Sequence, residues 1–242
     1  MDLLLSINWF AVGQIILIDI LLGGDNAIVI ALACRNLPPK LRRRGILFGT
    51  FGAIAIRVVL IAFAVTLLQV PYLKLVGGAL LFWIGIKLLA DDDGEHAEIP
   101  ASDRLYAAVK AIVVADLVMS VDNVIAVAGA AENAGGEHRM LLVAFGILVS
   151  IPIIIWGSTI VLKLMERLPI IVTMGAALLG YISGGMAASD TAIAPWLATR
   201  LSTLELNIPG TAIHINLAAI ITAGAVVFIG KALMKGRKPS KA

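Results

Sequence analysis

The chain has 242 residues, of which 60% are hydrophobic and only 14% charged, and its formal net charge is +3. This composition excludes a water-soluble domain of ordinary make-up and favours a membrane protein that crosses the bilayer several times. The single cysteine, Cys34, excludes an intrachain disulfide framework and a metal site built from thiolates. The basic residues occupy short connections and the C-terminal tail, so nucleic acid is not an expected partner.

Seven apolar segments come close to or exceed the length of about 18–20 residues that a membrane-spanning helix needs. In chain order, the predicted helices cover residues 9–33, 46–68, 72–89, 106–131, 141–162, 170–186 and 213–233. The first is interpreted as a retained helix rather than a signal peptide, because no basic residue precedes it and it contains Asp19 and Asp25. We also predict a short amphipathic helix within 192–206 and a solvated Asp190 near a helix end. The predicted fold class is all-α: a polytopic membrane protein with seven transmembrane helices in a single transmembrane domain, 1–242.

The distribution of lysine and arginine predicts the orientation of the chain in the membrane. Arg57 lies within a predicted helix, and only Lys74, Arg139 and Arg200 fall on one side of the membrane. All other basic residues, including the tail 235–242, fall on the other side. We therefore expect a multi-pass protein of the plasma (inner) membrane with its N-terminus outside and its C-terminus in the cytoplasm.

A constant offset of 97 residues, the separation of Asp19 from Asp116, aligns two parts of the chain. It continues without a gap and superposes Phe48-Gly49 on Phe145-Gly146 and Gly78-Ala79 on Gly175-Ala176. Residues 7–90 and 104–188 are therefore predicted to be two copies of a three-helix unit, with the seventh helix, 211–234, outside the repeat. Because three is an odd number, the second copy enters the membrane from the opposite side, and this inverted 3+3 repeat is typical of secondary transporters.

Each copy carries two aspartates and an asparagine inside an apolar helix. These candidate metal ligands are Asp19, Asp25 and Asn26 in the first copy and Asp116, Asp122 and Asn123 in the second. An ionisable group at this depth costs roughly 2.5–3.5 kcal/mol on insertion scales. Carboxylate and carboxamide oxygens suit Mg²⁺, Ca²⁺ and Mn²⁺, so a bound cation would offset that cost. We expect Asp19 to lie level with Asp122 on the outer half and Asp25 level with Asp116 on the inner half.

Five further residues are possible accessories to this site. Gly23 and Gly24 permit local unwinding of the first helix, and Ser120 shares a helical stripe with Asp116 and Asn123. Met119 is either a soft ligand that favours manganese or an ordinary packing residue. Arg57 is either a counter-charge for Asp19 or Asp25 that replaces the cation, or part of a static ion pair.

At these positions the sequence resembles the TerC family of integral membrane proteins, in particular its short, seven-helix, YjbE-like branch. The resemblance rests on Gly23-Gly24-Asp25-Asn26 and Ser120-Val121-Asp122-Asn123, with Asp19 and Asp116 six residues upstream of the two motif aspartates. It implies membership of the LysE-like transporter superfamily and a role in metal-ion homeostasis, with manganese export as the expected activity.

The function predicted from the sequence is export of divalent cations, Mn²⁺ first, by alternating access and coupled to proton antiport. The expected partners are the cation, protons and the bilayer; no permanent cofactor and no enzymatic activity are expected, and a homo-oligomer is left open. The alternatives are a Ca²⁺ or other divalent cation/proton antiporter and a non-transporting membrane scaffold in metal homeostasis. An intramembrane aspartyl protease fits less well because Leu22 breaks the Gly-x-Gly-Asp pattern. A prenyltransferase would place its aspartates in loops at the membrane edge.

Overall fold

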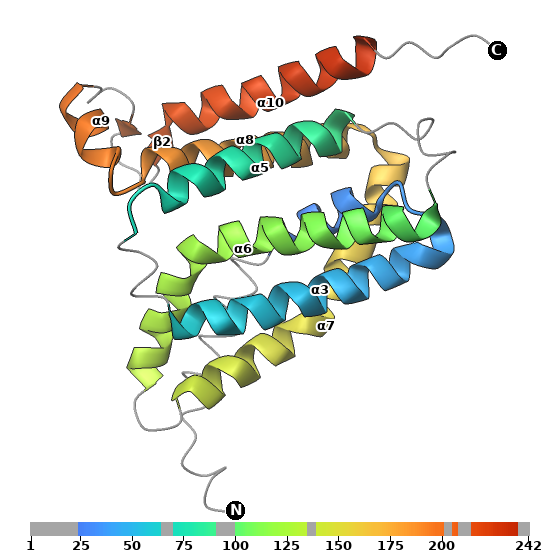
Figure 1. Ribbon diagram of the computed structural model, residues 1–242, viewed down its shortest axis with the longest axis horizontal. Coiled ribbons are helices and arrows are strands. Elements are labelled where there is room, and N and C mark those ends of the chain that lie inside the picture. Colours follow the sequence, from blue (N-terminus) through green and yellow to red (C-terminus); the bar gives the residue numbers. More distant parts are fainter. Residues whose placement is uncertain are drawn as a thin grey trace, which may run out of the picture.

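A computed structural model describes residues 24–63, 70–90, 100–134, 139–200, 205–207 and 214–236, and these are almost entirely helical (Figure 1). The long helices are Gly24–Cys34, α3 (Pro39–Ala62), α5 (Leu73–Ala90), α6 (Ala101–Ala134), α7 (Arg139–Arg167), α8 (Ile170–Ala188) and α10 (Leu217–Gly236). A short helix, α9 (Ala194–Arg200), and two antiparallel strands, β1 (Glu205–Asn207) and β2 (His214–Asn216), lie between α8 and α10.

The positions of the helices follow the predicted apolar segments, but several ends differ. α3 begins at Pro39 rather than at 46, because proline is well suited to the first turn of a helix and the basic turn that follows stays helical. The expected helix in 192–206 ends at Arg200, and strand β1 follows it. Strand β2 likewise takes the place of the predicted start of the last helix at 213. Residues 9–23 of the first predicted helix and 237–242 of the tail lie outside the described residues.

Among the described residues, four helices are long and apolar enough to cross a membrane. The prediction of seven transmembrane helices is therefore supported for four of them and stays a prediction for the other three. The four spans are Leu73–Ala90, Leu148–Arg167, Ile170–Ala188 and Leu217–Lys235. Large apolar side chains cover the outer surface of these helices: Trp156 is 70% exposed and Phe228 75% exposed. A surface of this kind is unfavourable in water, and lipid is the solvent it suits.

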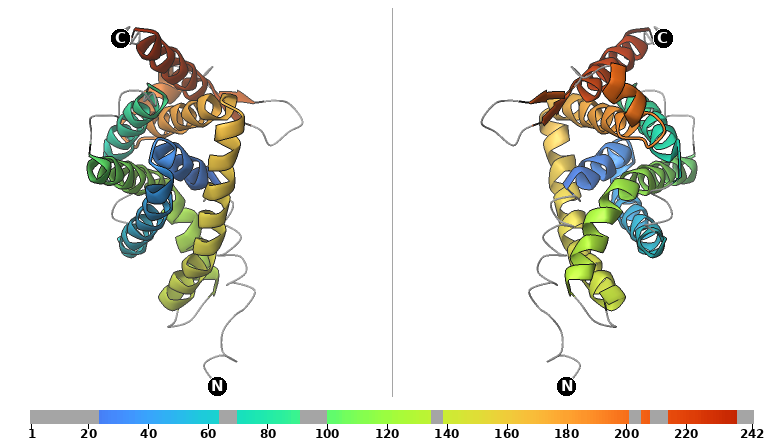
Figure 2. Two further views of the ribbon diagram at one scale, coloured as in Figure 1. Left: turned by 90° about the vertical axis from the view of Figure 1, so that its right-hand side faces the viewer. Right: turned by 90° about the vertical axis from the view of Figure 1, so that its left-hand side faces the viewer.

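The helices form two tightly packed groups around the Gly24–Cys34 helix. α5, α8 and α10 pack on one another in one group, and α3 packs along α6 in the other. The Gly24–Cys34 helix, which we call the central helix, lies between them, and α7 crosses beside it (Figure 2). Its side chains Ala31, Leu32 and Cys34 are buried in the main hydrophobic cluster.

Small residues allow the close approach of α8 to its neighbours. A methyl group added at Gly184 would come within 2.7 Å of the carbonyl oxygen of Ala218 and 2.8 Å of the Cα atom of Ala219, both in α10. These are backbone atoms, which cannot move aside for an added methyl group as the end of a flexible side chain can. Since apolar burial supplies little drive for association in lipid, such close contacts carry helix packing in membranes.

We predict that Gly184→Ala destabilises the α8–α10 contact by about 1–3 kcal/mol through overpacking. Gly185→Ala is the matched control, because a methyl group there meets no atom within 4 Å. Both changes bring the same gain in helix propensity, so their difference isolates the contact. Thermal unfolding of the purified protein in detergent measures it, and equal melting temperatures for the two variants would contradict the packing described here.

The basic residues gather at one end of the helix bundle. The start of α3, the end of α5, the start of α6 and the end of α10 all lie at the right of Figure 1. At this end Arg42 of α3 forms an ion pair with Glu166 of α7, and both side chains are partly exposed. An exposed pair of this kind stabilises little. The ion pair nevertheless shows that the start of α3 and the end of α7 lie at the same end of the bundle.

Asp190 is buried rather than solvated, so that prediction is wrong. Its carboxylate accepts hydrogen bonds from the backbone N–H groups of Tyr72 at 3.1 Å, Leu75 at 3.1 Å and Ala192 at 2.9 Å. Burial alone favours the neutral acid, but the N–H donors of Ala192, Leu75, Tyr72 and Lys74 outweigh it and hold the pKa of Asp190 below its ordinary value. The carboxylate thus caps the start of α5, next to Tyr72 with its positive φ of 65°.

We predict that Asp190→Ala destabilises the protein by about 2 kcal/mol at pH 7, because several backbone donors lose their acceptor. A pKa that folding lowers gives stability that is fully present above the unfolded value of about 3.9 and is lost as the pH falls through the folded value. The difference between wild type and variant should therefore be constant above about pH 5 and shrink below about pH 4. Unfolding curves between pH 3 and pH 7 test this, and a difference that already shrinks near pH 6 would contradict it.

Candidate functional site

Three polar side chains form a hydrogen-bonded network between α3 and α6. The guanidinium of Arg57 in α3 forms an ion pair with Asp116 in α6 through Nη2 and Oδ1. Arg57 also donates from Nε to Oγ of Ser120 at 3.2 Å, and that hydroxyl donates to Oδ2 of Asp116 at 3.1 Å. Arg57 is 4%, Asp116 5% and Ser120 0% exposed, so the network is fully buried.

The regular helical geometry of α6 places these groups together. Asp116 and Ser120 are four residues apart and share one face of α6, which stays helical through both motif positions. Arg57 reaches that face because α3 packs along α6. A charge at this depth is tolerated only when its partner and remaining hydrogen bonds are supplied, and here the hydroxyl of Ser120 completes the pair.

The first motif lies in the first described turn of the central helix, beside this network. Oδ1 of Asp25 accepts a hydrogen bond from the backbone N–H of Asn26 at 2.9 Å. Asp25 is half-buried and interacts electrostatically with both Arg57 and Asp116. The structure therefore brings one acid from each motif to the same arginine.

Asn26 is the unusual residue of the site. Its side chain is only 4% exposed, and neither its amide nitrogen nor its carbonyl oxygen has a hydrogen-bond partner among the described residues. A buried carboxamide in this state costs roughly 1–3 kcal/mol for each unsatisfied group. Buried polar groups are nearly always satisfied, so this carboxamide calls for a polar or ionic partner.

The other predicted site residues fall into three sets. Asp19 and Gly23 lie outside the described residues. Asp122 and Asn123 lie on α6, but their side chains are not among those described. Gly24 is exposed, and a methyl group there would meet no atom within 4 Å. The pairing of Asp19 with Asp122 thus stays a prediction.

Met119 is buried within the main hydrophobic cluster, 3% exposed. That environment is the one expected of a packing methionine. Among the described residues Arg57 forms its ion pair with Asp116, and it interacts electrostatically with Asp25. Its expected role as a counter-charge for Asp19 stays a prediction. The sequence indicated a functional arginine by its position within an apolar helix, but it gave no sign that α3 would lie against α6.

The described residues supply oxygen donors of one chemical kind. Two carboxylates, one carboxamide and one hydroxyl, from Asp25, Asp116, Asn26 and Ser120, lie in this part of the molecule. No three His, Cys, Asp or Glu side chains cluster among the residues that were placed. Two acids and one arginine leave one negative charge, and hard oxygen ligands of this kind suit a cation such as Mn²⁺, Mg²⁺ or Ca²⁺.

The apolar helices and the buried charges between them define a polytopic helical membrane protein with a polar site in its interior. The profile of the integral membrane protein TerC family matches residues 5–237, which is nearly the whole chain, and this protein belongs to that family. The resemblance inferred from the two motifs is thereby confirmed.

Relatives from two bacteria show the same character. The chain is 44% identical over 193 residues to the uncharacterized membrane protein YjbE of Bacillus subtilis, covering 79% of this chain and 85% of the relative. It is 25% identical over 192 residues to the uncharacterized membrane protein YceF of the same organism, covering 76% and 72%. It is 27% identical over 158 residues to the UPF0053 inner membrane protein YgdQ of Escherichia coli, covering 58% and 67%. No solved structure matches the chain.

We predict that Asp116→Leu destabilises the protein by about 3–5 kcal/mol, because it removes the carboxylate of a buried ion pair and leaves the charge of the arginine in place. The double variant Arg57→Leu/Asp116→Leu removes both charges and should recover most of that loss. Unfolding of the purified protein by sodium dodecyl sulfate in mixed micelles measures both. A double variant as unstable as the sum of the two single variants would contradict the coupling.

Proposed function

We propose that this protein exports divalent cations, manganese first, by alternating access around the acids of the central helix and α6. The observation that carries the proposal is the buried carboxamide of Asn26 beside Asp25, which has no hydrogen-bond partner in the described part of the chain. A cation coordinated there gives the carbonyl oxygen a partner and compensates the remaining negative charge. Membrane-embedded acids that serve only to hold helices together would be satisfied by each other or by neutral partners at lower cost.

The helix contacts support the inverted repeat. In such a repeat the central helix corresponds to α6, α3 to α7 and α5 to α8. Gly77 of α5 lies against Val118 of α6, and Gly175 of α8 lies against Leu32 of the central helix. The two helix pairs correspond under this exchange, although the contacting residues differ. Gly49 of α3 likewise lies against Ile112 of α6, and Gly157 of α7 lies against Ala27 of the central helix, which is the corresponding helix pair. Secondary transporters with this organisation bind their substrates at the repeat interface.

Arg57 acts in this proposal as a tethered positive charge. With no cation bound, its guanidinium neutralises Asp116. An arriving divalent cation competes for the same carboxylate, and the arginine returns when the cation leaves. The position one repeat length later holds Ile154, which is buried in the hydrophobic cluster. The two halves are therefore chemically unequal, and the second lacks this internal counter-charge.

Proton antiport follows from the same charge balance. When the cation leaves, the described part of the site keeps one more carboxylate than it has arginines, and a proton supplies a missing positive charge in the apolar interior. The gathering of basic residues at one end of the bundle supports a cytoplasmic position for that end, with the C-terminus inside and the N-terminus outside.

The proposal predicts that Mn²⁺ drives proton movement in proteoliposomes and that Asp25→Asn slows it by at least about tenfold, as loss of even supporting residues of metal sites does. The readout is a pH-sensitive dye trapped in the vesicles, with Mn²⁺, Ca²⁺, Mg²⁺, Fe²⁺ and Zn²⁺ added in turn. Asn26→Leu should slow transport while leaving the fold intact, because it removes an unsatisfied buried amide. Glu166→Gln is the control, since it removes an exposed carboxylate outside the site.

Three results would contradict the proposal. The first is no proton movement with any of the five cations. The second is full transport by Asp25→Asn, which is the behaviour of a scaffold whose acids are structural. The third is equal loss in the Glu166→Gln control, which would point to a general effect of removing charge. A response to Ca²⁺ but not Mn²⁺ would keep the transport mechanism and correct the substrate.

A further inference from the structure

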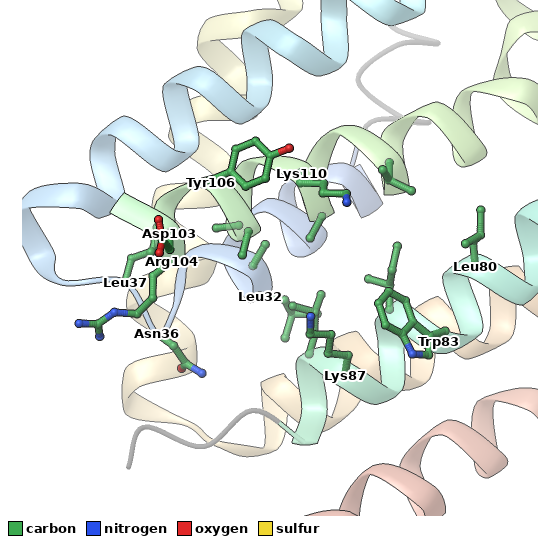
Figure 3. A pocket seen from close by; sticks show the side chains of 17 residues that line it. Leu32, Asn36, Leu37, Leu80, Trp83, Lys87, Asp103, Arg104, Tyr106 and Lys110 are labelled. Carbon is green, nitrogen blue, oxygen red and sulfur yellow. The ribbon is translucent and has the colours of Figure 1, made fainter. Parts of the chain in front are cut away.

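A cavity of about 810 Å³ lies between the central helix, α5 and α6, at the basic end of the bundle. None of the site residues described above lines it. Leu32 lies at its floor, while Trp83 and Lys87 of α5 face Tyr106 and Lys110 of α6 across it (Figure 3). We call this cavity the lysine groove.

The lysine groove is apolar along its depth and cationic near its mouth. The remaining apolar lining consists mostly of aliphatic side chains, namely Ala33, Leu37, Leu80, Ile84, Leu88, Ala107, Ala108, Ala111 and Val114. Trp83 is 58% and Tyr106 70% exposed. Exposed Trp and Tyr side chains near helix ends are typical of the level of the lipid headgroups.

Two positive charges enter the groove from opposite walls. The ammonium groups of Lys87 and Lys110 both point toward its interior in Figure 3. Lys87 lies 5.3 Å from the centre of the Trp83 ring, and neither lysine forms an ion pair with a carboxylate among the described residues. One acid and one further base, Asp103 and Arg104, line the end of the groove away from Trp83.

We propose that the lysine groove binds an anionic phospholipid, with its phosphate between Lys87 and Lys110 and an acyl chain along the apolar lining. The charge fits a phosphodiester, and the apolar walls fit a hydrocarbon chain, which a free phosphate ion lacks. Basic pockets between transmembrane helices on the cytoplasmic side bind lipid headgroups of this kind. The proposal is independent of metal transport, because it uses none of the residues of the cation site.

Native mass spectrometry of the detergent-purified protein tests it, with phosphatidylglycerol and phosphatidylcholine of identical acyl chains as probes. Wild type should retain phosphatidylglycerol in preference to phosphatidylcholine. Lys87→Gln/Lys110→Gln should weaken phosphatidylglycerol binding by about thirtyfold, from the usual contribution of a lysine near an anionic headgroup. Lys231→Gln/Lys235→Gln is the matched control, because it removes two exposed charges from the same end of the bundle, on α10.

A second readout does not depend on the variants folding equally well. Phosphatidylglycerol with brominated acyl chains should quench the fluorescence of Trp83, seen as the difference between wild type and Trp83→Phe. Each of the following would overturn the proposal: no preference for phosphatidylglycerol, equal losses in both double variants, or full displacement of the lipid by glycerol phosphate. Binding that emerges only after Asp91, Asp92, Asp93 and Glu95 are neutralised would overturn it too, by making the chain's own acidic segment the occupant.

Discussion

The buried ion pair between Arg57 and Asp116 is the interaction on which the interior of this protein depends. In an apolar interior neither charge is tolerable alone, so α3 and α6 are held in the one register that brings the two together. The hydroxyl of Ser120 completes the hydrogen bonding of both. Asp25 interacts electrostatically with both members of the pair. One contact between two helices thus lies within electrostatic reach of an acid on a third helix, the central one.

Much of the architecture could be predicted from the sequence because a membrane-spanning helix needs a long apolar segment, which is easily recognised. The predicted 72–89 and 170–186 differ from α5 and α8 by no more than two residues at either end. Features that arise between distant segments could not be found in this way. Asp190 caps α5 from 115 residues away along the chain, and no local pattern signals such a contact. The strands β1 and β2 are three residues each, too short for a periodic pattern.

In the candidate site, too, some features could be predicted from the sequence and others could not. The repeated motifs gave the residue types, because carboxylates inside an apolar helix are conspicuous in any sequence. Which of them meet is a tertiary property: Asp25 lies near Asp116 because the central helix packs between the two helix groups. The unsatisfied carboxamide of Asn26 and the lysine groove are likewise visible only when three helices are placed together. The assignment of Asp19, Asp122 and Asn123 to the site still rests on the sequence motif alone.

The division of the helices into two packed groups has a mechanical consequence. Arg57 and Asp116 both belong to the α3–α6 group, so a sliding or tilting of α5, α8 and α10 against that group carries the ion pair along unchanged. In the second group, the glycines of α8 allow its backbone to pack closely against that of α10. The central helix touches both, and its acid is therefore the one whose surroundings such a movement alters.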